Sequence, residues 1–215
     1  MTATTRDPEL PRRLLLAERD ALLPILRSAP PGALDRPTCL PGWSVRDVLA
    51  HCAAAFTMTV NRSWHGFSPE ENQRDVDERR GLPVEDVLAE LESGYAATAE
   101  AAAAANGALD GLALGGWLHG GDVREALDRP DAYTSSGADD ALVLLIERSR
   151  QPERRIPRTT VSLSGRSDVI LGSTGPEASL CTDTGTLFRL CAGRQPDPGR
   201  YELTGAGPSS YVLFD

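Results

Sequence analysis

Apolar residues recur at helical spacing through the first two thirds of the chain and predict a series of amphipathic helices. The leucines within residues 9–28 fall on one helical face, and the Pro-Pro pair that follows ends this helix. A second helix is expected to begin at Ser44, because Asp47 follows it three residues later in a spacing typical of a capping box. Its apolar face continues through Phe56.

Further along, the pattern predicts three more helices with different clarity. The polar stretch 68–83 favours a shorter helix or a loop, and a long helix follows over residues 84–105 until an Asn-Gly pair ends it. Segment 111–127 is also helical in pattern but contains five glycines, each of which costs about 1 kcal/mol in a helix interior relative to alanine. Close packing of another element, or a backbone that surrounds a ligand, would compensate. Residues 138–150 predict a fifth helix.

The pattern changes after residue 150. An arginine- and proline-rich segment, RSRQPERRIPRTT, predicts a linker. Beyond it, TTVSLS, SDVILGS, EASLCT, RYELTG and SYVLF alternate as strands do, and TLFRLCAG predicts one short helix. We therefore expect an α+β protein, with a helical domain over residues 1–150 and a small α+β domain over residues 156–215 that docks on the helices.

Charge and composition exclude several classes of function. With 31 acidic and 22 basic residues, the net charge of -9 repels a phosphate backbone, so we expect no nucleic-acid partner. All the basic residues are arginines, which excludes lysine Schiff-base chemistry and P-loop phosphate binding. No apolar run approaches the ~18 residues of a membrane span, and the N-terminus lacks a signal-peptide pattern, so we expect a cytoplasmic protein.

The cysteines are scattered and form no CxxC pair, which fits neither a zinc knuckle nor a disulfide scaffold. We expect reduced and mostly buried thiols at these four positions, Cys39, Cys52, Cys181 and Cys191.

Two histidines on separate predicted helices, His51 and His119, are candidates for a shared metal site in a bundle core. Asp122 shares the helix face of His119 and is expected either to ligate or to orient that histidine. Asp47 has the same relation to His51, although a capping role is the preferred interpretation. His65 is a poor third ligand, since it would lie about 21 Å further along a continuous helix. The alternative is that His51 is a core histidine bonded to a backbone carbonyl and Asp122 a surface charge.

The flanking sequences add a family resemblance. PGWSVRDVLAH and HGGDVREAL resemble motifs of the mycothiol-dependent maleylpyruvate isomerase family, and GSTGPEASLCTDTGTLFRLCAGR followed by LTGAG is similar to its C-terminal part. The resemblance implies a DinB-like antiparallel four-helix bundle followed by a small α+β domain. It also implies the thiol mycothiol as cofactor and a divalent metal, expected to be zinc, with His51 and His119 as ligands.

The chain departs from this family at one position. Family members commonly carry a carboxylate one helical turn before the second histidine, where this chain has Gly115. Either Asp122, water and substrate complete the metal sphere, or metal affinity is weakened or lost. In an active member a metal-bound thiolate adds to an activated double bond and departs after rotation. Arg80, or its neighbour Arg79, would hold substrate carboxylates, with a solvated surface charge as the alternative.

Three hypotheses of function follow. The first is a mycothiol-dependent isomerase or thiol transferase that acts on a small electrophilic, carboxylate-bearing substrate through a metal-bound thiolate. The second is a metal-free tailoring enzyme of the same fold that uses a glycine-lined pocket. The third is a non-catalytic small-molecule binding module. We favour the first. In each case the partner is a small molecule, with neither nucleic acid nor membrane involved.

Overall fold

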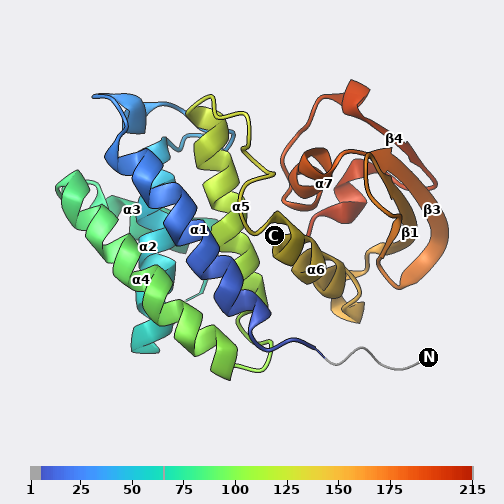
Figure 1. Ribbon diagram of the computed structural model, residues 1–215, viewed down its shortest axis with the longest axis horizontal. Coiled ribbons are helices and arrows are strands. Elements are labelled where there is room, and N and C mark those ends of the chain that lie inside the picture. The colour runs from blue at the N-terminus through green and yellow to red at the C-terminus, as the bar shows by residue number, and fades with distance from the viewer. Residues whose placement is uncertain (1–5, 65, 215) are drawn as a thin grey trace. The chain divides into compact units, whose positions relative to one another are not determined.

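Four helices pack around a common core in the first part of the computed structural model, which describes residues 6–64 and 66–214 (Figure 1). Helix α1 contacts α4, α4 contacts α2, α2 contacts α5, and α5 contacts α1, so the four enclose a core between them. The expected four-helix bundle is thus confirmed. The bundle helices are α1 (Leu10–Arg27), α2 (Val45–Asn61), α4 (Val84–Ala104) and α5 (Asp110–Ala126).

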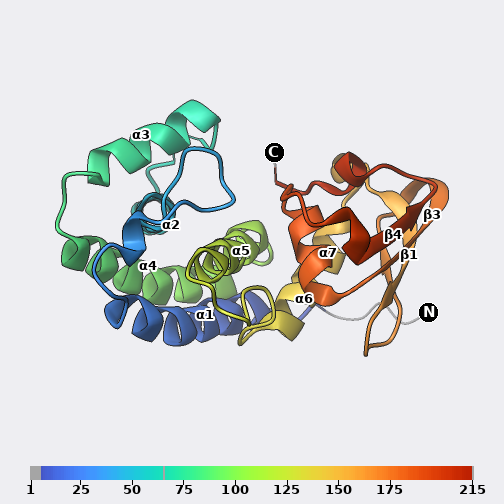
Figure 2. The ribbon, with the colours of Figure 1, turned by 90° about the horizontal axis from the view of Figure 1, so that it is seen from above.

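Local sequence chemistry sets the ends of these helices. The expected capping box at the start of α2 is present, with the Ser44 side chain accepting from the Asp47 backbone and the Asp47 carboxylate accepting from the Ser44 backbone. The polar stretch 68–83, for which a short helix or a loop was expected, contains a helix, α3 (Pro69–Arg79), that begins with a second capping box at Ser68. Helix α3 packs on α2 (Figure 2). Among the described residues, no helix is long and apolar enough to cross a membrane.

The chain forms two compact units, one ending at Asp140 and one beginning at Ala141. Helix α6 (Ala138–Ser149) contains the point of division. The domain limits expected from the sequence stay a prediction, because compactness does not show which segments fold independently.

The second unit is built on a four-stranded mixed sheet in the order β2-β1-β3-β4. Strands β1 and β3 are parallel, and β2 and β4 pair antiparallel at the two edges. Alternate residues of β1 are buried and exposed, as the sequence pattern predicted. The elements of this unit are β1 (Pro157–Leu163), β2 (Val169–Leu171), β3 (Thr174–Thr182), α7 (Thr184–Cys191) and β4 (Tyr201–Thr204).

The strand expected in SYVLF is wrong. Residues Pro208–Tyr211 form a 3₁₀ helix, and the Leu213 amide donates to the carbonyl oxygen of Cys191 at 2.8 Å. Tyr211 and Leu213 are both fully buried, so the alternation of this segment comes from two side chains entering the core rather than from a strand ladder.

The glycines of α5 are places where other side chains pack against the helix. An added Cβ at Gly116 would lie 2.8 Å from the Phe56 ring, and one at Gly121 would lie 2.6 Å from the Tyr133 ring. At Gly120 it would lie 1.7 Å from a carboxylate oxygen of Glu18. Close packing, the first of the two reasons offered from the sequence, therefore explains these three glycines.

Glu18 belongs to a buried ion pair that joins α1 to α5. Its two oxygens accept from the Arg124 guanidinium at 2.8 and 3.0 Å, and both side chains are fully buried. Such a pair contributes little net stability relative to apolar residues, but removing one partner leaves a buried charge and costs about 3 to 5 kcal/mol. Once formed, the pair fixes the rotation and height of α5 against α1.

We predict that Gly120→Ala lowers the free energy of unfolding by about 2 to 4 kcal/mol. The new Cβ displaces the Glu18 carboxylate from Arg124, which outweighs the ~1 kcal/mol that alanine returns in a helix interior. Urea denaturation followed by circular dichroism measures the change.

Gly81→Ala is the matched control, because no atom lies within 4 Å of its added Cβ and its φ is not positive. That variant is expected to stay within about 0.5 kcal/mol of the parent protein. Equal stability of the two variants would contradict a packing role for Gly120.

Candidate functional site

The two candidate histidines lie next to each other in the first unit. The ring centroids of His51 on α2 and His119 on α5 are 5.2 Å apart, and the rings meet edge to face at 83°. The ring centroid of Trp43 lies 5.2 Å from that of His51, and the centroid of Phe67 lies 6.5 Å from it. The structure thus brings together the histidines that the sequence placed on separate helices.

His51 is held as a neutral imidazole with an unused nitrogen. Its side chain is buried, and its Nδ1 has no hydrogen-bond partner among the described residues. Burial lowers the pKa of His51 to about 3, and repulsion between the protonated forms of His51 and His119 adds to this effect. A neutral ring keeps a lone pair on one nitrogen, which is available to a ligand.

Asp122 is fully buried and is therefore not the surface charge of the alternative interpretation. One of its carboxylate oxygens lies 3.0 Å from Nδ1 of His119. Its other oxygen accepts hydrogen bonds from the Tyr133 hydroxyl and, at 3.1 Å, from the Cys39 thiol. With both oxygens engaged by protein donors, Asp122 is suited to orient His119 rather than to ligate a metal.

This contact assigns the tautomer of His119. When Nδ1 donates its hydrogen to this carboxylate, the neutral ring of His119 has its lone pair on Nε2. Ligating histidines in metal sites commonly carry such a carboxylate on the second ring nitrogen.

Asp47 has the capping role that the sequence favoured. Its carboxylate accepts from the Ser44 amide at 2.9 Å and from the Ser44 hydroxyl at 2.8 Å. Among the described residues, no hydrogen bond or ion pair joins Asp47 to His51, so Asp47 acts as part of the N-terminal cap of α2.

The two candidate arginines are engaged with protein carboxylates. Arg79 forms a bidentate pair with Glu90, with distances of 2.9 and 2.7 Å. Arg80 is largely exposed and pairs with Asp77 at 2.9 Å. A role of Arg80 in holding a substrate carboxylate stays a prediction, since these contacts also suit a solvated surface charge.

The donor set offers two nitrogens for a metal. Across residues 6–64 and 66–214, no group of three or more His, Cys, Asp or Glu side chains has a geometry that could hold an ion. Gly115 has no side chain to donate, and His65 lies outside the described residues. The unpartnered Nδ1 of His51 and the carboxylate on His119 fit a metal bound by two imidazoles, which is short of the three protein ligands usual in catalytic zinc sites.

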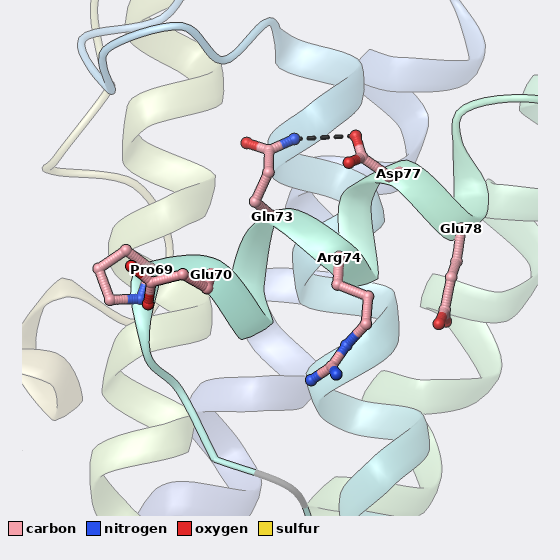
Figure 3. A pocket seen from close by; sticks show the side chains of 6 residues that line it. All are labelled: Pro69, Glu70, Gln73, Arg74, Asp77 and Glu78. Carbon is pink, nitrogen blue, oxygen red and sulfur yellow. Dashed lines mark hydrogen bonds between the residues drawn. The ribbon is translucent and has the colours of Figure 1, made fainter.

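An open pocket of about 690 Å³ lies over α3 (Figure 3). Its lining side chains come from one helix and are mostly polar, and Gln73 donates to Asp77 at 2.9 Å. Gln73 also accepts from the Trp43 indole at 3.0 Å, which ties α3 to the ring that packs on His51. We assign no chemistry to this pocket because a single helix face lines it.

Sequence reasoning missed three residues that surround the histidines. Tyr133 and Cys39 both donate to Asp122, and Trp43 packs on His51. Cys39 and Trp43 lie in the RPTCLPGW loop, which looked like a connection, although a bridge between Pro37 and Ser44 closes it. For Tyr133 the available indication was Gly121, whose missing side chain makes room for the tyrosine ring.

Comparison with known proteins gives a family and a fold. A family model described as the mycothiol maleylpyruvate isomerase N-terminal domain matches residues 15–129. A crystal structure of the mycothiol-dependent maleylpyruvate isomerase is similar, with a TM-score of 0.59, 14% identity and 93% of each chain covered. The crystal structure of a histidine-to-alanine mutant of that enzyme is similar with a TM-score of 0.60 and 12% identity, and 93% of each chain is again covered. At this identity the structures show the fold alone. No curated protein sequence matches the chain.

We predict that His51 makes a destabilising contribution that grows as the pH falls from about 6.5 towards 3 in the presence of a chelator. In the unfolded chain His51 takes up a proton near its ordinary pKa, whereas burial holds its pKa in the folded state at about 3. In that window His51 therefore lowers the free energy of unfolding by up to ~1.4 kcal/mol for each unit of decrease in pH. Urea titrations between pH 7.5 and 4.5 measure the slope.

His51→Leu is the comparison variant because it removes the titrating group and keeps an apolar side chain at the position. Its stability curve is expected to fall less steeply below pH 6 than that of the parent. Parallel curves for the two proteins would contradict a buried, neutral His51.

Proposed function

We propose that this chain, which belongs to the mycothiol maleylpyruvate isomerase N-terminal domain family, is an enzyme that uses the thiol mycothiol to act on a small electrophilic substrate. The reaction is isomerisation of the substrate or transfer of the thiol to it. The observation that carries this proposal is the pair of imidazoles, His51 and His119, that meet at 5.2 Å with His119 oriented by a buried carboxylate.

Within this proposal, His51 and His119 would hold a divalent metal, with zinc as the best candidate for two nitrogen donors. When bound, such a cation lowers the pKa of a coordinated thiol and keeps it as thiolate at neutral pH. Sulfur and water would supply the positions that the described residues leave open.

The chain's own residues prepare the site. Asp122 fixes the His119 tautomer through Nδ1, and Tyr133 and Cys39 hold the Asp122 carboxylate in turn. Burial of His51 keeps its ring neutral, because a protonated imidazole is costly away from water. His51 therefore keeps a lone pair at neutral pH, and Asp122 orients the ring of His119.

A second candidate is a metal-free enzyme of the same fold. The absence of a third donor among the described residues, together with Gly115, favours it. The glycine-lined pocket expected for this hypothesis, and for a binding module, loses part of its basis, because Phe56, Glu18 and Tyr133 fill the space beside three of the glycines.

We predict about one zinc per untagged chain in the parent protein and loss of that metal in His51→Ala and His119→Ala. Asp122→Asn is expected to weaken zinc binding about 10- to 100-fold without abolishing it, as loss of an orienting carboxylate does elsewhere. Elemental analysis after dialysis against buffered zinc measures the content.

Cys181→Ser is the control, because it removes an exposed thiol of the second unit and should leave the zinc content unchanged. Parent protein that binds no zinc, and whose turnover with mycothiol is unchanged after exhaustive chelation, would replace the metal-dependent proposal with the metal-free one. Absence of any turnover with mycothiol would contradict the mycothiol-dependent proposal.

A further inference from the structure

Exposed large apolar side chains of the first unit gather beside the histidines. Among the described residues of the whole chain, five such side chains stand out, and three of them lie within eight positions at the end of α2 and in the segment that follows. Val60 is 44% exposed, Trp64 41% and Phe67 43%. Single exposed apolar residues are ordinary, but a cluster of large ones marks a contact surface.

These rings continue into the site. Trp64 and Phe67 meet edge to face, with centroids 4.9 Å apart and planes at 70°. Phe67 in turn faces the His51 ring at 6.5 Å and 73°. A row of aromatic rings thus runs from solvent to the buried imidazole pair, in the edge-to-face geometry that aromatic groups prefer.

Most of the arginines discussed for the adjacent elements already donate to protein acceptors. The Arg46 guanidinium donates to the carbonyl oxygens of Arg80 and Leu82. Arg79 and Arg80 are paired with carboxylates, as described above. Arg62 is exposed and has no ion pair among the described residues, so it is the cation that the experiment must examine.

We propose that the electrophile handled by this site carries a neutral aromatic group, which lies against Trp64 and Phe67 while its reactive carbon reaches the histidines. This inference rests on the proposed function for the reaction, but the aromatic contact itself does not require turnover. A protein partner fits less well, because a stable protein interface uses about 20 to 30 residues a side. The two contacting rings of Trp64 and Phe67 suit one ring system of a small molecule.

The binding test uses N-phenyl-1-naphthylamine, a neutral aromatic probe whose fluorescence rises in apolar surroundings. Parent protein is compared with Trp64→Ala, Phe67→Ala and the control Leu82→Ala, which removes an exposed apolar side chain outside the cluster. Loss of one stacking ring is expected to weaken probe binding about tenfold. The control should stay within about twofold, and circular dichroism checks that each variant folds.

The kinetic test uses three epoxides that differ in one substituent, with mycothiol conjugates measured by mass spectrometry. Styrene oxide carries a phenyl group, propylene oxide a methyl group and glycidate a carboxylate. We expect the highest kcat/KM for styrene oxide, and we expect Trp64→Ala to lower the ratio of styrene oxide to propylene oxide. Arg62→Gln should leave that ratio unchanged.

The two tests separate the inference from the proposed function. Equal probe binding by the parent, Trp64→Ala and Phe67→Ala, or no probe binding at all, overturns the aromatic contact. Preference for glycidate that Arg62→Gln removes also overturns it. Ring-dependent probe binding without turnover of any epoxide supports the aromatic contact and counts against the proposed reaction.

Discussion

The structure depends on how closely other elements approach one helix. Helix α5 lacks side chains at Gly116, Gly120 and Gly121, and in their places it receives the side chains of Phe56, Glu18 and Tyr133. Each of these comes from a different part of the first unit, so three independent contacts fix the position of α5. The contacts that fix α5 also fix the backbone positions of His119 and Asp122, because both residues lie on this helix.

Two buried carboxylates act on α5 in different ways. Glu18 pairs with the guanidinium of Arg124, whereas Asp122 accepts from the Tyr133 hydroxyl and the Cys39 thiol and contacts Nδ1 of His119. The first arrangement joins α1 to α5 and serves packing. The second orients the ring of His119, a residue of the candidate site.

The fold could be predicted largely from the sequence because helical periodicity and capping residues are local. The bundle helices, the capping box at Ser44 and most of the strands were confirmed. The segment 210–214 was assigned wrongly, because two buried side chains with one residue between them look like a strand. The histidines could be identified from their flanking motifs. Tyr133, Cys39 and Trp43 were missed, because they reach the site through loops whose course no periodicity encodes.

The contact between Gly120 and Glu18 also constrains how such a sequence can change over time. A side chain at position 120 and a carboxylate at position 18 compete for one volume, and that carboxylate is the counterion of Arg124. Substitutions at the three positions are therefore expected to be coupled: a lineage that gains a side chain at position 120 should also replace Glu18 and Arg124. In an alignment of relatives, these positions should vary together, although they are spread over about half of the chain.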